Sequence, residues 1–275
     1  MKPQTISEQM QYNTVRLVAD DGSTGTGFFF EFIFSENKHV PIIITNKHVV
    51  NNNKKQAVDF FLHSKNGDEP DSEKINISFN TDWHFHDNQD LCFCFIAPLF
   101  QQIRDIKQKE VFFIPITEKL IWDNKKLEEL SAIEDVVMVG YPNGLWDEKN
   151  NLPLFRRGIT SSHPAMDFNN KNIGAVDMAC FPGSSGSPIF ILNENGYTDK
   201  RGTSYLGRKR LVFLGILFQG PQLNAKGKLI FENIPTQQKI SSLTPMMINL
   251  GYYIRATEIL AFKPIIEKII QNSSR

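Results

Sequence analysis

The sequence has few cysteines, no net charge and no long hydrophobic run. Three cysteines among 275 residues are too few for a disulfide framework, so we expect buried free thiols in a reducing compartment. Basic and acidic residues number 30 each, which gives no electrostatic preference for nucleic acid or an anionic membrane. No apolar run approaches the roughly 18 residues of a membrane span, and the N-terminus lacks the apolar core of a secretory signal. We therefore expect a cytoplasmic protein that binds neither nucleic acid nor membrane.

Short apolar segments separated by polar turns predict an all-β protein with two β-rich halves. Hydrophobic residues make up 41 % of the chain, which is enough for a sizeable core. Strands are predicted at 14–19, 25–34, 40–45, 57–63, 75–79 and 91–97, and then at 135–140, 158–161, 174–179, 187–192 and 211–219. The short strands of the first half indicate a closed barrel or a sandwich.

The composition also suggests where the chain divides. The stretch from 118 to 130 is mixed in charge and poor in glycine, which predicts a partly helical connector. Apolar residues at helical spacing between Ile259 and Ile270 predict a C-terminal amphipathic helix, which Pro264 should start or kink. The predicted units are an N-terminal half at 1–117, a connector at 118–134, a second half at 135–252 and the helix at 253–275.

A serine- and glycine-rich stretch, A-C-F-P-G-S-S-G-S-P-I-F at 179–190, lies between apolar segments. Glycine permits positive φ and close approach of a substrate, so such a turn can present one hydroxyl beside backbone N–H groups. Ser185 is the serine that has a glycine after it and another two residues before it. A plain Ser/Gly turn fits the same letters, so the question is whether a base and an acid exist elsewhere.

His48 and Asp90 are the candidate base and acid. His48 follows the apolar run I-I-I-T, and Asp90 directly precedes the strongly apolar run L-C-F-C-F-I-A. Taken singly, each has an ordinary alternative as a surface histidine or a turn-forming aspartate. Asp82 and Asp87 compete for the acid role, and Asp90 is preferred because it adjoins the buried strand.

In this order the motifs resemble those of the chymotrypsin-like (trypsin-fold) serine peptidases, especially disulfide-free bacterial members such as the Deg-type proteases. The similar segments are G-T-G-F-F-F (25–30), T-N-K-H-V-V (45–50), D-L-C-F-C-F-I (90–96), G-Y-P-N-G-L (140–145), R-R-G-I-T-S-S (156–162), D-M-A-C-F-P-G-S-S-G-S-P-I-F (177–190) and G-I-L-F-Q-G (215–220). The serine motif is the most specific of them and the aspartate motif the least.

The resemblance implies two six-stranded antiparallel β-barrels with the active site between them, followed by the C-terminal α-helix. It implies that Ser185 is the nucleophile, His48 the general base and Asp90 the group that orients the imidazole. The N–H groups of Gly183 and Ser185 would form the oxyanion hole.

The resemblance also implies a substrate-binding site. Its residues would be Ala179, Cys180, Phe181, Phe218, Gln219 and Gly220. None of them is a carboxylate, so we expect a small or apolar residue before the cleaved bond rather than arginine or lysine. The basic loop at 193–210 is either a solvated hairpin or a substrate- or partner-binding loop.

The remaining histidines give no convincing metal site. His84, His86 and Asp87 form the motif H-F-H-D but lack a third ligand at a suitable spacing, and His63 and His163 have no obvious partner. We expect neither a metal nor a cofactor.

Three hypotheses follow. The first is a serine endopeptidase that acts on a peptide or protein substrate. In one version, drawn from the resemblance, it belongs to a bacterial defence or signalling system and is controlled by a regulatory protein partner. The second is a catalytically silent module of the same fold that binds peptides. The third is a β-barrel interaction domain in which the motifs are coincidental.

Overall fold

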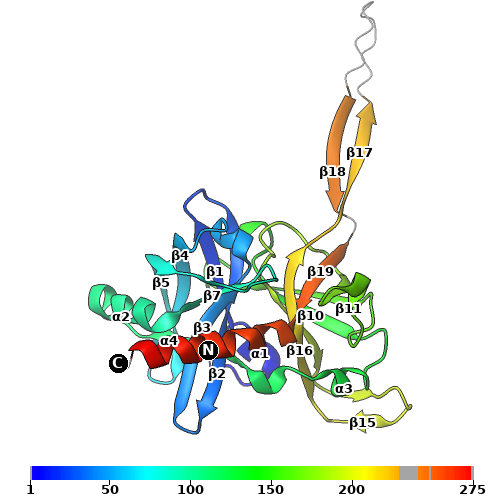
Figure 1. Ribbon diagram of the computed structural model, residues 1–275, viewed down its shortest axis with the longest axis horizontal. Helices are drawn as coiled ribbons and strands as arrows, with labels where there is room; N and C mark the ends of the chain where they lie inside the picture. The colour runs from blue at the N-terminus through cyan, green and yellow to red at the C-terminus, as the bar shows by residue number, and fades with distance from the viewer. Residues whose placement is uncertain (1, 229–240, 248, 274–275) are drawn as a thin grey trace, which may run out of the picture.

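The computed structural model describes residues 2–228, 241–247 and 249–273, which form two β-rich halves joined by a connector (Figure 1). A short helix, α1 (Ile6–Met10), precedes them and begins at a capping box made by Thr5 and Glu8. None of the described helices is long and apolar enough to cross a membrane.

The N-terminal half is one nine-stranded sheet. Its strands are β1 (Thr14–Ala19), β2 (Thr24–Ser35), β3 (Lys38–Thr45), β4 (Lys55–Asn66), β5 (Glu69–Asp82), β6 (His84–Phe85), β7 (Cys92–Phe95), β8 (Val111–Phe112) and β9 (Ile116–Thr117). The main order is β5-β4-β1-β2-β3-β7-β6, with β8 beside β4 and β9 parallel to β2. The first strand has the predicted bounds. The long strands extend beyond their predicted bounds, because polar residues at their ends continue the pairing with the neighbouring strand up to the turns.

The predicted closed barrel is not observed in this half, where β5 and β6 are the ends of an open sheet. One reason is that the run predicted as a strand at 91–97 is a strand for only four residues. Helix α2 (Ile96–Lys107) begins there and buries Ile96, Leu99 and Ile103 against the sheet. These positions follow helical spacing, which the continuous apolar letters before them had obscured.

The C-terminal half is a closed six-stranded barrel, which confirms the prediction for this half. Its strands in barrel order are β10 (Asp135–Gly140), β11 (Leu154–Thr160), β12 (Ile173–Asp177), β19 (Leu250–Arg255), β16 (Arg210–Gln219) and β13 (Pro188–Asn193). The connector contains the predicted helical pieces, η2 (Glu118–Leu120) and α3 (Asn124–Leu127).

Two hairpins extend from the barrel strands. Strands β14 (Gly196–Thr198) and β15 (Ser204–Leu206) pair within the basic loop, which is therefore a hairpin. Strands β17 (Gln222–Lys228) and β18 (Ser241–Met247) pair with each other between β16 and β19, and the sequence analysis had not predicted them.

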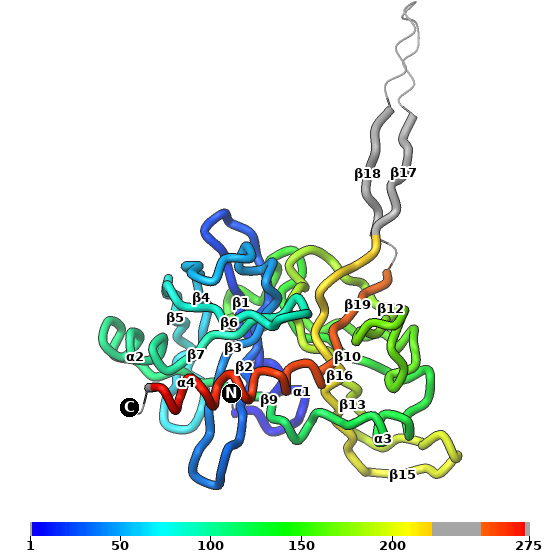
Figure 2. Tube along the Cα trace, in the orientation of Figure 1, coloured from blue at the N-terminus to red at the C-terminus, as the bar shows by residue number. Residues whose placement is uncertain are grey.

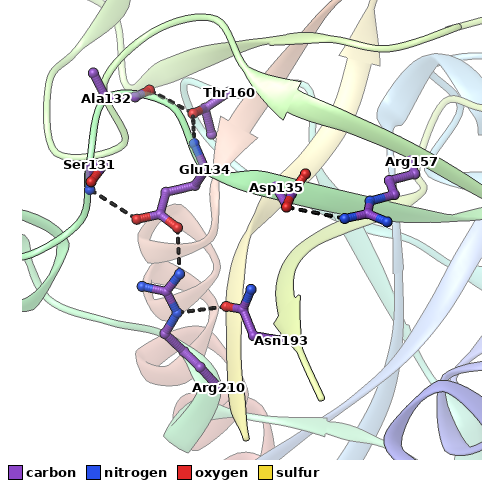
Figure 3. A network of polar contacts seen from close by, with 8 residues as sticks. All are labelled: Ser131, Ala132, Glu134, Asp135, Arg157, Thr160, Asn193 and Arg210. Carbon is purple, nitrogen blue, oxygen red and sulfur yellow. Dashed lines mark hydrogen bonds and ion pairs between the residues drawn. The ribbon is translucent and has the colours of Figure 1, made fainter. Parts of the chain in front are cut away.

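A buried ion pair ties the end of the connector to the barrel (Figure 3). The Arg210 guanidinium at the start of β16 donates to the Glu134 carboxylate, and both side chains are more than nine-tenths buried. The other oxygen of Glu134 accepts the N–H of Ser131 at 2.9 Å. Because both charges are paired and hydrogen-bonded, they can remain buried beside the barrel.

The C-terminal segment crosses the N-terminal half (Figures 1 and 2). The predicted helix at 253–275 begins later than expected, because Tyr253–Arg255 belong to β19 and η5 (Ala256–Ala261) follows. Helix α4 (Phe262–Ser273) comes next, and residues 274 and 275 lie outside the described residues. Phe262 packs on Phe93 of β7, with ring centres 4.8 Å apart.

One hydrophobic core extends across both halves. Phe28 of β2 packs edge-on against Phe213 of β16 at 5.6 Å between ring centres, and both are buried. The same cluster includes Phe190 of β13 and Phe262 of α4. The two halves are therefore held together along β2, where the candidate site lies.

Candidate active site

His48 lies in a short turn directly after β3. The turn η1 (Lys47–Val50) buries Val49 and Val50 in the N-terminal core, which leaves the His48 side chain 42 % exposed. Gly25 makes this close packing feasible, since a Cβ built there would lie only 2.4 Å from a methyl group of Val49. The first glycine of the G-T-G motif thus fixes the turn that presents His48.

Asp90 is the aspartate that contacts His48. Its Oδ2 lies 2.5 Å from Nδ1 of the imidazole, and its Oδ1 accepts the His48 backbone N–H at 3.2 Å. The Asn46 side chain donates to the Asp90 carbonyl at 2.7 Å and fixes the loop. Neither Asp82, at the end of β5, nor Asp87 forms a hydrogen bond with His48 in the described chain. With a proton held on Nδ1, Nε2 is left as the basic nitrogen.

The turn at residues 181–187, called here the serine turn, packs against β2. The Thr26 N–H donates to the Ser185 carbonyl at 2.9 Å. Strand β3 is the neighbour of β2 and leads into the His48 turn, so the serine turn and His48 lie at the same part of the sheet. The Ser185 hydroxyl is half-buried and makes no hydrogen bond with any described residue. In ligand-free structures of enzymes, catalytic hydrogen bonds are often long and tighten only when substrate is bound.

Besides the N–H of Phe181 at its start, the serine turn has two backbone N–H groups without a partner in the described chain, those of Gly183 and Ser185. The carbonyls of the same peptide units are held: Pro182 O accepts from the Asn143 N–H at 2.5 Å, and Ser184 O accepts from the Ser187 N–H at 3.0 Å. In a trans peptide the N–H points opposite to the C=O, so these contacts fix the direction of both free N–H groups.

Asn143 holds the serine turn through its backbone N–H, and the sequence analysis had not singled it out. It lies in η3 (Pro142–Gly144) with φ +51°, a left-handed conformation that asparagine tolerates better than most residues. The motif G-Y-P-N-G-L had been noted, but only the fold shows that the backbone N–H of its asparagine donates to the Pro182 carbonyl, in the peptide unit before Gly183.

A pocket of about 160 Å³ opens beside Ser185. Its lining residues are Cys180, Phe181, Pro182, Ser185, Leu217, Phe218, Gln219 and Gly220. All the predicted substrate-binding residues line it except Ala179, while Pro182 and Leu217 had not been predicted. Burial raises the pKa of the Cys180 thiol to about 11, so this wall is neutral at pH 7. Among the described residues, no carboxylate lines the pocket.

A larger cleft of about 660 Å³ continues from this pocket. It lies between the Asp90 loop, the segment 168–173 and Tyr252, and it shares Phe218 and Gln219 with the smaller pocket. The walls thus come from both halves of the chain.

His86 shapes the loop that carries Asp90. Its Nδ1 accepts the N–H groups of Asn88 at 3.1 Å and Gln89 at 3.0 Å. Its Nε2 faces a Glu258 oxygen at 3.6 Å. Burial lowers the pKa of His86, which favours the neutral ring that can accept these bonds. The motif H-F-H-D thus contributes a turn, and the described residues contain no cluster able to hold a metal ion.

Comparison with known proteins places these features in context. The sequence profile of the family described as "Trypsin-like peptidase domain" matches residues 25–197, which include His48, Asp90 and Ser185. No curated protein matches the chain. Among solved structures, a human astrovirus serine protease is similar at 13 % identity and a TM-score of 0.41, over 90 % of this chain and 93 % of that one. An inactivated protease paralogue of the scabies mite is similar at 11 % identity and a TM-score of 0.46, over 96 % and 97 %.

Proposed function

Because the chain belongs to the trypsin-like peptidase domain family, we propose that it is a serine endopeptidase that uses Ser185, His48 and Asp90. One arrangement supports this most strongly: the 2.5 Å contact of Asp90 with the His48 imidazole, beside the Gly183 and Ser185 N–H groups of the serine turn, which are unpaired in the described chain. A module that only binds peptides has no need of this combination.

The proposed reaction has two halves, acylation of Ser185 and hydrolysis of the acyl-enzyme. The Ser185 hydroxyl attacks the peptide carbonyl while Nε2 of His48 takes its proton, and the Asp90 carboxylate stabilises the imidazolium. The N–H groups of Gly183 and Ser185 stabilise the oxyanion, each donor contributing roughly 10²–10³ in kcat. His48 then protonates the leaving amine. Water loses a proton to His48 as it attacks the acyl-enzyme, and His48 passes that proton to the Ser185 oxygen as the acid product leaves.

The substrate that fits best carries a small or apolar residue before the cleaved bond. The adjacent pocket is small and neutral, with Phe181, Leu217 and Phe218 among its walls. An arginine or lysine side chain would enter it without an opposite charge, which is unfavourable. The edge at Phe218–Gly220 would pair with the substrate backbone as an added strand.

We also propose a cytoplasmic location and one specific protein target. All three cysteines are buried free thiols, as is typical of a reducing compartment. The unbonded Ser185 hydroxyl is the feature that a regulatory partner would change, by ordering the cleft. Any role in bacterial defence or signalling rests on the family resemblance.

The test is labelling with a fluorophosphonate probe, which reacts with activated serines. We expect the wild type to be labelled, and both Ser185→Ala and His48→Ala to lose labelling while keeping the wild-type circular dichroism and melting temperature. Ser184→Ala is the matched control, because Ser184 lies in the same turn and should not react. Folded wild type that stays unlabelled would favour the peptide-binding module instead.

A further inference from the structure

Arg16 of β1 is a half-buried arginine with no carboxylate partner in the described chain. The deeply buried arginines do have one: Arg210 pairs with Glu134 (Figure 3), and Arg255 lies 2.6 Å from Asp167. Nε of Arg16 is fully buried and makes no hydrogen bond with any residue that the structure describes. A guanidinium remains charged under all ordinary conditions, and an unpaired charge at a partly buried site is costly.

Two aromatic rings hold the Arg16 guanidinium in place. Its central carbon lies 3.9 Å from the ring centre of Trp146 and 4.7 Å from that of Phe61. Stacking of this kind immobilises the planar group and occupies its faces rather than the N–H groups of its edge. The exposed Glu148 acts on Arg16 electrostatically but forms no ion pair with it. Arg16 is therefore ordered in advance of any ligand.

Arg16 is connected to the serine turn through Thr26. Its register partner on β2 is Thr26, whose N–H donates to the Ser185 carbonyl and whose hydroxyl donates to the Gly183 carbonyl at 3.2 Å. Neighbouring strands are about 4.8 Å apart. From the other side, a Cβ built on Gly144 would lie 3.5 Å from Nη2 of Arg16, and the Gly144 nitrogen lies 3.0 Å from a Cβ built on Gly183.

The position of Arg16 indicates which part of a substrate it would meet. The pocket for the residue before the cleaved bond is lined only by residues of the C-terminal half. Arg16 is linked to the serine turn through Thr26 of the N-terminal sheet and through Gly144 of the turn after β10, neither of which lines that pocket. A peptide whose residue before the cleaved bond occupies this pocket therefore places the residues after the bond on the Arg16 side of Ser185.

We propose that Arg16 binds a carboxylate of the substrate on the leaving-group side, within the first three residues after the cleaved bond. The substrate class is then a peptide segment with a small or apolar residue before the bond and Asp or Glu shortly after it. This inference rests on the proposed peptidase function. Charged, planar pairing of guanidinium with carboxylate supplies the selectivity.

The experiment is cleavage-site profiling with a proteome-derived peptide library, read on both sides of the cut. Wild type is compared with Arg16→Met, Arg16→Gln and the control Arg157→Met, whose arginine is exposed and lies 3.1 Å from Asp135. We expect wild type and control to enrich Asp and Glu at one of these three positions. In matched Asp and Asn peptides, the Asp peptide should be cleaved about tenfold better, a preference that both Arg16 variants lose and that salt weakens.

The outcomes separate the two proposals. Loss of acid enrichment in the Arg16 variants, with fluorophosphonate labelling and the preference before the bond unchanged, supports the carboxylate site. Absence of enrichment in wild type, or enrichment that survives in Arg16→Met and Arg16→Gln, overturns it. If wild type neither labels nor cleaves, the peptidase function fails. Fluorescence anisotropy then measures the binding of the same Asp and Asn peptides to wild type and to Arg16→Gln. A preference for the Asp peptide that only wild type shows supports the carboxylate site, and its absence overturns it.

Discussion

Gly183 in the serine turn has φ +83°, and the space where a side chain would begin is occupied. A Cβ built there would lie 2.7 Å from the Tyr141 carbonyl oxygen and 3.1 Å from the Asn143 nitrogen. Gly183→Ala must therefore shift the peptide unit whose N–H is proposed to stabilise the oxyanion. We expect kcat on a cleaved peptide to fall by about 10²–10³, with a much smaller effect on KM.

Gly202 provides a matched control for this substitution. It has φ +85°, but no atom lies within 4 Å of a Cβ built on it. Gly202→Ala thus imposes the same backbone strain, of about 1–2 kcal/mol, without moving the serine turn. It should lower the melting temperature slightly and leave kcat unchanged. Equal loss of activity in both variants would mean that stability, not the direction of the N–H group, explains the effect at Gly183.

At this same scale, the sequence identified the residues that have distinctive neighbours in the chain. His48, Asp90 and Ser185 each stand in a short motif, and the structure brings His48 and Asp90 into contact. Asn143 and Arg16 could not be found this way. The role of Asn143 depends on a backbone contact, and the role proposed for Arg16 depends on the absence of an ion pair. Both features involve segments that are distant in sequence.

At the scale of elements, the sequence predicted strands well where apolar and polar residues alternate. The bounds of β1 and β10 were predicted correctly. Errors occurred where one apolar run spans two elements, as at β7 and α2, because continuous apolar letters carry no period. The end of β19 also lay within the predicted C-terminal helix.

The loop between β6 and β7 illustrates how one element positions another. His86→Leu removes the acceptor for the N–H groups of Asn88 and Gln89 and so loosens the turn before Asp90. We expect kcat to fall by about tenfold or more, since buried donors left unpaired cost about 1–3 kcal/mol. KM should change little, because Asp90 acts mainly on the transition state.

His86→Asn tests whether hydrogen bonding is the reason. An asparagine oxygen can accept N–H groups two or three residues further along, as it does in turns, so most of kcat should return. A kcat equally low in the Asn and Leu variants would show that His86 acts through its packing on Phe262, at 5.6 Å between ring centres.

At the scale of the whole molecule, stability should decrease in acid because of His63. This side chain is 6 % exposed and packs edge-on against Tyr12. Burial lowers the pKa of His63 to about 4 from an ordinary value of 6.5. The unfolded chain binds a proton below pH 6.5 while the folded chain does not. The stabilisation that neutral His63 contributes is therefore fully present above pH 6.5. It is lost as the pH falls toward 4, which lowers the free energy of unfolding by about 3 kcal/mol in all.

Urea unfolding at about pH 7 and about pH 4 measures this loss. His63→Gln removes the titrating group. Between the two pH values, the free energy of unfolding of this variant should therefore fall by about 3 kcal/mol less than that of wild type. His39→Gln is the control. His39 is exposed, and its hydrogen bond to Glu31 raises its pKa, which stabilises the fold in acid rather than opposing it. Removing it cannot reduce the acid loss. If His63→Gln loses as much stability as wild type, other buried groups that take up protons on unfolding, such as His84 and His86, must account for the acid sensitivity.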